Sequence, residues 1–144
     1  MLSRYQACRA IPALFLAFVA CDGFIAVDGH VFARAEGDTV LPSQAFVDRN
    51  APDTTGLMRL DGAVVSVFHV PADTALADSA QVWVDHDTTS SNGHFHTASV
   101  TAPSRFTALL RVRRAGYRPV DATFVHDTIL HRAIVILTPE GTRR

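Results

Sequence analysis

Histidine is the residue type whose pattern in this sequence could support chemistry. The chain contains seven histidines, and His94 and His96 flank Phe95 directly after an Asn-Gly dipeptide. In an extended strand, residues i and i+2 point to the same side, so these two imidazoles would lie roughly 7 Å apart on one face. Imidazole nitrogen is a common ligand of zinc and copper. The spacing is therefore compatible with a metal site.

A third ligand would come from the preceding strand. His86 lies across the expected hairpin from His94 and His96, and Asp85 and Asp87 are beside it in the sequence. The alternative interpretation is a polar outer face that flanks a core Phe95, with no metal. The remaining histidines are scattered and are interpreted as surface or strand-end residues: His30, His69, His126 and His131.

A turn and two strands must position these histidines. The dipeptide Asn92-Gly93 readily adopts positive φ at successive positions and predicts a tight hairpin turn. After it, Phe95 should face the core. Residues 106–112 alternate between apolar and polar side chains, with Leu109 as the exception. This period of two is typical of a half-buried strand.

The same alternation, or an apolar run, recurs along the chain and no long helix is indicated. Seven strands are predicted, at residues 24–34, 62–70, 81–86, 94–99, 106–112, 120–124 and 132–138. Short strands separated by turn residues predict an all-β fold, a single antiparallel β-sandwich. Residues 36–61 are expected to form a long loop or insertion. Gly29, inside the first strand, suggests a bulge or a close backbone approach.

Length and charge exclude some classes of function. The 144 residues are enough for one domain. The formal net charge of −1 provides no polybasic surface, so a nucleic-acid partner is not expected. Arg111, Arg113 and Arg114 could form a small basic patch for an anionic partner. The alternative is an ordinary solvated strand face.

The first 20 residues predict a signal peptide. Arg4 and Arg9 precede the apolar run from Ile11 to Ala20, which is too short to span a bilayer. The alternative is a buried helix. The following residues, Phe18-Val19-Ala20-Cys21, resemble the lipobox of bacterial lipoproteins, although leucine is usual at the position of Phe18. This resemblance implies that Cys21 is lipidated and that residues 21–144 form a domain on a membrane anchor.

The two cysteines are consistent with this interpretation. Cleavage before Cys21 removes Cys8 with the signal peptide, and the mature chain then has no disulfide. A bridge between Cys8 and Cys21 would instead require an uncleaved signal. Without lipidation, a periplasmic or secreted location is the alternative.

Several short motifs together resemble the carboxypeptidase regulatory-like domains, which have a transthyretin-like (prealbumin-like) Greek-key sandwich. The motifs follow the family order: Val27-Asp28-Gly29-His30-Val31, Gly62-Ala63-Val64-Val65, Gly93-His94-Phe95, Pro103, residues 106–112, Gly116-Tyr117 and Leu137-Thr138-Pro139. The segments from Gly29 to Gly62 and from Val70 to Gly93 are longer than is usual in the family.

The resemblance implies a non-catalytic structural or binding module without a cofactor, whose partner would be an envelope protein or a carbohydrate. Two enzyme families share parts of the fold. Hydroxyisourate hydrolases end in a Tyr-Arg-Gly-Ser signature that is missing here. Intradiol dioxygenases use two tyrosines and two histidines on iron, whereas Tyr117 alone remains once Tyr5 leaves with the signal. The sequence also lacks a Gly-x-Ser-x-Gly elbow, so no enzyme activity is expected.

Overall fold

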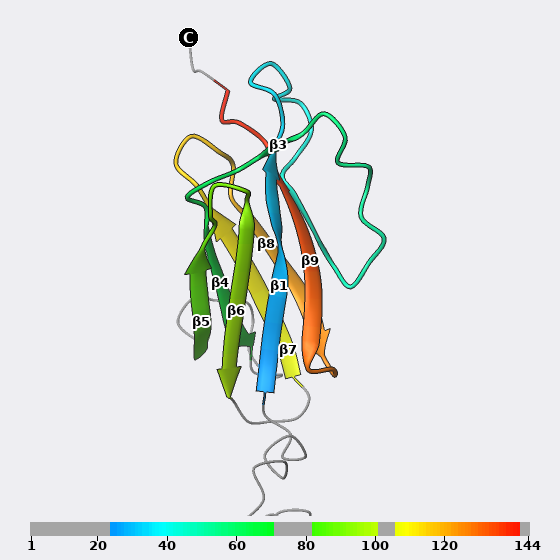
Figure 1. Cartoon of the computed structure of the whole chain (residues 1–144), viewed down its shortest axis with the longest axis vertical. Coiled ribbons are helices and arrows are strands. Elements are labelled where there is room, and N and C mark those ends of the chain that lie inside the picture. Colours follow the sequence, from blue (N-terminus) through cyan, green and yellow to red (C-terminus); the bar gives the residue numbers. More distant parts are fainter. Residues whose placement is uncertain (1–23, 71–81, 101–105, 142–144) are drawn as a thin grey trace, which may run out of the picture.

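The computed structural model describes residues 24–70, 82–100 and 106–141 (Figure 1), and this part of the chain contains β-strands and no helix. The predicted signal peptide, Cys8, Cys21 and Pro103 lie outside these residues. The strands are β1 (Phe24–Ala33), β2 (Gln44–Val47), β3 (Met58–Arg59), β4 (Val64–Val70), β5 (Val82–Thr88), β6 (His94–Val100), β7 (Phe106–Arg113), β8 (Val120–His126) and β9 (Leu130–Leu137). Within the described ranges, no helix has the length and apolar character needed to cross a bilayer.

The strands form two sheets, which confirms the predicted all-β sandwich. The first sheet has the order β2-β9-β1, and both β6 and β3 pair with the far side of β1. The second sheet has the order β5-β4-β7-β8. All described pairs are antiparallel except β1 and β9, which run parallel. The predicted loop at 36–61 contains β2 and β3, so the described residues form nine strands in place of the seven predicted.

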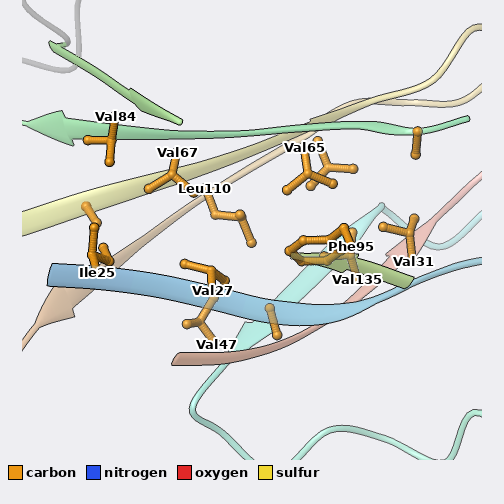
Figure 2. Close-up of a cluster of buried hydrophobic side chains, with 14 of the residues drawn as sticks. Ile25, Val27, Val31, Val47, Val65, Val67, Val84, Phe95, Leu110 and Val135 are labelled. Carbon is orange, nitrogen blue, oxygen red and sulfur yellow. The ribbon is translucent and has the colours of Figure 1, made fainter. Parts of the chain in front are cut away.

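The core lies between the sheets and follows the predicted alternation (Figure 2). Val27 and Phe95 from the first sheet point toward Val65, Val67 and Leu110 from the second. All five side chains are at most 1% exposed. Burial of each such side chain contributes roughly 1.5–3 kcal/mol of transfer free energy. The period-2 pattern therefore identified the inward faces correctly.

Gly29 marks a close approach between backbones. The pairing of β1 with β6 and β9 continues through Gly29 without a bulge. A Cβ atom at this position would lie 2.1 Å from the carbonyl oxygen of Ala133 and 3.0 Å from the ring of Phe95. Glycine is required here because a side chain would collide with the neighbouring strand.

The hairpin prediction at Asn92-Gly93 is wrong. β5 pairs with β4, whereas β6 pairs with β1 in the other sheet. Gly93 has a φ of 74°, but Asn92 does not have positive φ, and a type I′ hairpin needs it at both positions. The amide of Gly93 donates to the carbonyl of Ser90 at 2.7 Å. This turn carries the chain from the second sheet to the first.

The other motif glycines lie at turns. Gly62 and Gly116 have φ values of 69° and 82°, which favour glycine. Tyr117 forms an isolated antiparallel bridge with Pro139. This bridge holds the segment after β9 against the turn before β8.

Candidate functional site

An exposed histidine cluster surrounds Asp28 on the outer face of the first sheet. Asp28 is the Cα partner of His96, and His30 is the partner of His94. One carboxylate oxygen of Asp28, Oδ1, lies 2.8 Å from Nε2 of His94 and 3.4 Å from Nδ1 of His96. The ring of His30 meets the ring of His94 edge to face, with centroids 5.2 Å apart. Alternation along β1 and β6 places all four side chains on one face.

The charges in this cluster shift two pKa values. Burial alone would raise the pKa of the Asp28 carboxyl, but the hydrogen bonds and charges of His94 and His96 outweigh burial and lower that pKa. The pKa of His30 is lowered, first by burial and then by the nearby charges of His94 and Arg59. At neutral pH the cluster therefore contains an ionised Asp28 and a neutral His30.

The structure does not bring His86 to this cluster. His86 lies on β5 in the second sheet, where its Cα partner is Ser66, whereas His94 and His96 belong to the first sheet. The predicted convergence depended on the hairpin, which does not form. Among the described residues, no group of three or more His, Cys, Asp or Glu side chains is arranged to hold a metal ion.

Asp85 and Asp87 have a different role from the predicted one. Oδ2 of Asp87 accepts a hydrogen bond from the amide of His96 at 2.8 Å, and Oδ2 of Asp85 accepts one from the amide of Ala98 at 2.8 Å. These amides belong to the outer edge of β6, where a further strand would otherwise pair. The two carboxylates satisfy this edge and join it to β5 of the second sheet, a device that discourages edge-to-edge aggregation.

A second set of one aspartate and two histidines runs from the surface into the sandwich, because the side chain of Asp48 is 42% exposed whereas both histidines are buried. Nδ1 of His126 is 3.0 Å from Nε2 of His131, and Nδ1 of His131 is hydrogen-bonded to Oδ2 of Asp48. His131 is fully buried and His126 is 3% exposed. The other oxygen of Asp48 accepts from the amide of Arg132 at 2.9 Å. We call these three residues the buried relay; it connects the end of β2 to β9 and β8.

The buried relay is a chain of two hydrogen bonds. Because an ionised carboxylate only accepts, His131 donates from Nδ1 to Asp48, and one proton lies between Nε2 of His131 and Nδ1 of His126. The pKa of His126 is lowered by burial and then by His131, although Asp127 opposes this effect. Asp48 has a φ of 51°, a conformation that few residues other than glycine adopt. The relay therefore holds both imidazole rings in one orientation.

His126 and His131 do lie at strand ends, as the last residue of β8 and the second residue of β9. They are not surface residues, because both are buried. The alternation of inward and outward residues in β8 and β9 already indicated that both histidines point inward. His126 continues the inward series of Val120, Ala122 and Phe124, and His131 begins the series that continues with Ala133 and Val135. The expected strands ended at 124 and began at 132, so each stopped just short of its histidine.

The predicted arginine patch is partly neutralised. Arg111 forms a two-point contact with Asp121, with Nη2 2.8 Å from Oδ2 and Nε 3.1 Å from Oδ1. Its guanidinium also lies 5.3 Å from the centre of the Phe68 ring. Arg113 approaches the same carboxylate at 3.8 Å. These contacts favour the solvated strand face over a free anion-binding patch.

Comparison with known proteins finds similarity of fold. No family model matches the sequence and no curated protein matches it. The shaft pilin SpaA from Lactobacillus rhamnosus GG superposes with a TM-score of 0.54 at 13% identity, covering 82% of this chain and 51% of the pilin. This chain therefore spans about half the length of that pilin. The likeness shows a shared β-sandwich.

Two further structures are similar to this chain at lower TM-scores. The dioxygenase domain of a carbohydrate-binding fusion protein from Streptomyces sp. SirexAA-E has a TM-score of 0.41 and 12% identity, covering 82% of this chain and 80% of that one. An alternative pilotin from the type II secretion system of Vibrio cholerae has a TM-score of 0.38 and 18% identity, covering 79% and 96%.

Proposed function

We propose that this protein is a non-catalytic β-sandwich module of the bacterial cell envelope, tethered to a membrane through Cys21 and acting as a structural or binding unit. We further propose that it belongs with the carboxypeptidase regulatory-like domains, on the strength of the motifs around Gly29, Gly62 and Gly116-Tyr117. Its partner would be an envelope protein or a carbohydrate.

The observation that carries this proposal is that the polar side chains of the candidate sites are paired with one another or with the backbone. Asp28 contacts His94 and His96, and the three residues of the buried relay are hydrogen-bonded to one another. Asp85 and Asp87 join the two sheets. Each of these carboxylates and imidazoles is thus already paired within the fold. Two hollows of the described surface, with volumes of about 250 and 520 Å³, are open to solvent. Such surfaces suit contacts with a macromolecule better than enclosure of a small substrate.

Support for the envelope location comes from the sequence. Arg4 and Arg9, the apolar run to Ala20, and Cys21 have the order of a lipoprotein signal. The shaft pilin that shares the fold is consistent with a structural use of this sandwich at a cell surface. One acyl chain binds a membrane marginally, whereas several give firm anchoring.

The test is the intact mass of the mature protein extracted from membranes, measured beside a Cys21→Ser variant. We expect a mass that begins at Cys21 and includes diacylglycerol, and we expect the lipid to be lost in the variant. A mass that begins elsewhere and carries no lipid would overturn the anchor. The protein would then be a diffusible domain.

A further inference from the structure

One end of the sandwich combines exposed apolar side chains with the point where the chain arrives from Cys21. Phe24 begins β1, and its side chain is 41% exposed. Ile129 and Leu130 form the turn into β9 and are 49% and 42% exposed. In Figure 1 the start of β1 and the turn between β8 and β9 both lie at the lower end.

These side chains are neighbours. The amide of Ala26 donates to the carbonyl of Ile129 at 2.9 Å, and Ala26 is the Cα partner of Leu130. Phe24 and Leu130 both project to the outer face of the first sheet, because they alternate with the inward Ile25 and His131. Together, Phe24, Ile129 and Leu130 form what we call the apolar tip.

The tether limits how far the apolar tip can be from lipid. Phe24 lies three positions after Cys21, with Asp22 and Gly23 between them, and an extended chain spans at most about 3.3–3.6 Å per residue. The start of β1 therefore lies within roughly 10–11 Å of the atom that would carry the acyl chains. A sandwich held so closely cannot keep this end away from the headgroup region.

We propose that the apolar tip rests on the membrane surface, with Phe24, Ile129 and Leu130 entering the boundary between headgroups and acyl chains. This inference rests on the proposed anchor at Cys21. Apolar and aromatic side chains favour this boundary when burial removes them from water. The long axis of β1 then points away from the bilayer and presents the Asp28 cluster above the lipid surface.

The opposite end supplies a matched comparison. Val40, Leu41 and Met58 are also exposed but lie at the far end of β1. Met58 is the Cα partner of the last residue of β1, Ala33, and Thr39, next to Val40, is 4.0 Å from the Cβ position of Gly141, which follows β9. Ten residues of strand at about 3.3 Å each separate the ends by roughly 30 Å. Apolar character alone does not distinguish the two ends, whereas the tether does.

The experiment uses the full lipoprotein in vesicles of phosphatidylethanolamine and phosphatidylglycerol. Cys8 leaves with the signal peptide and Cys21 is acylated, so Ile129→Cys and Val40→Cys each introduce a single free thiol. Each variant is labelled with an environment-sensitive fluorophore. We expect a blue shift of emission and quenching by headgroup-labelled lipid at position 129, and neither at position 40.

Three outcomes are informative. A shift at position 129 alone supports the proposal, and adding Phe24→Ser with Leu130→Ser should reduce that shift while the circular dichroism spectrum stays unchanged. A shift at position 40 alone, or at neither position, in protein whose mass includes diacylglycerol would overturn the apolar tip and leave the anchor intact. A mass without diacylglycerol would overturn the anchor, and this proposal with it.

Discussion

The same residue types occur twice in this protein in two different surroundings. The exposed cluster has Asp28 with His94 and His96, and the buried relay has Asp48 with His131 and His126. In the exposed cluster the side chains of His94 and His96 are 39% and 51% exposed. In the relay both histidines are almost completely buried. The histidines therefore differ in burial, whereas the side chains of both aspartates are partly exposed, Asp28 by 30% and Asp48 by 42%.

Burial changes what each hydrogen bond contributes. Water competes for every polar group of the exposed cluster, so its ion pairs are expected to stabilise the fold little. No such competition reaches His131, and a buried group left without a partner costs about 1–3 kcal/mol. The relay should therefore be part of the structural framework, while the Asp28 cluster is available for contact with a partner.

The largest expected effect comes from His131→Ala. The substitution removes both hydrogen bonds that His131 makes in the relay and leaves the buried His126 without that partner. It also leaves a cavity beside Phe124, whose ring centroid is 4.7 Å from that of His131. We expect a loss of about 2–5 kcal/mol in the free energy of unfolding. Urea denaturation followed by circular dichroism would measure it.

The matched variant is His94→Ala, which removes an exposed imidazole that contacts Asp28. Its expected cost is below about 1 kcal/mol. Equal losses for His94→Ala and His131→Ala would contradict the view that burial separates the two sets.

Asp48→Asn should have the next largest effect. Asparagine tolerates the positive φ of this position, so backbone strain is held constant. Its amide has one acceptor oxygen in place of two, whereas Asp48 accepts from both Arg132 and His131. We expect a loss of about 1–2 kcal/mol, measured by the same denaturation. A neutral result would show that Asp48 is dispensable to the relay.

Stability should also depend on pH through the relay. The pKa of His126 is lowered from its ordinary 6.5, so below this pH the unfolded chain binds a proton that the folded chain resists. Stability is therefore complete above about pH 6.5 and falls as the pH drops through the lowered pKa, with a slope of at most about 1.4 kcal/mol per pH unit for one proton. His30, whose pKa is also lowered, contributes in the same direction.

His126→Gln isolates the contribution of the relay, and His30→Gln is its control in the exposed cluster. Denaturation curves from about pH 7.5 to about pH 4.5 avoid Asp28, whose lowered pKa acts below its ordinary 3.8. We expect His126→Gln to flatten the decline more than His30→Gln does. The reverse order would place the main acid-sensitive group outside the core.

Much of the fold could be predicted from the sequence because strands reveal their buried face by alternation. Phe95 and the series from Phe106 to Val112 were assigned to the core correctly, and of the two alternatives predicted for Gly29, a bulge or a close approach, the structure shows the close approach. These features depend on local pattern and on the size of a single side chain. Such information is contained in a short window of residues.

The partners of each strand could not be predicted in the same way. A turn at Asn92-Gly93 is compatible with a hairpin or with a crossing between sheets, and only the distant contacts of Gly93 with Val31 decide between them. The predicted histidine site therefore included His86, which lies in the other sheet, and did not include Asp28. The relay was missed because Asp48 lies 83 positions from His131, and their meeting depends on β2 pairing with β9.

The smallest effect is expected for Asp28→Asn. The substitution keeps the shape of the side chain and removes the charge that lies between His94 and His96. Because Asp28 and both of its histidine partners are partly exposed, water replaces the lost interaction, and the free energy of unfolding should change by less than about 1 kcal/mol. Asp48→Asn makes the same chemical change at a carboxylate that is also partly exposed but whose partner, His131, is buried, so the difference between the two variants measures the effect of the partner's burial.

This last comparison has two clear results. If Asp28→Asn is as costly as Asp48→Asn, the exposed cluster is part of the framework and cannot be reserved for a partner. If it is nearly neutral, the variant keeps the fold while altering the charge of the outer face. It is then the appropriate protein for asking whether binding to an envelope partner depends on this face, because a loss of binding could not be attributed to unfolding.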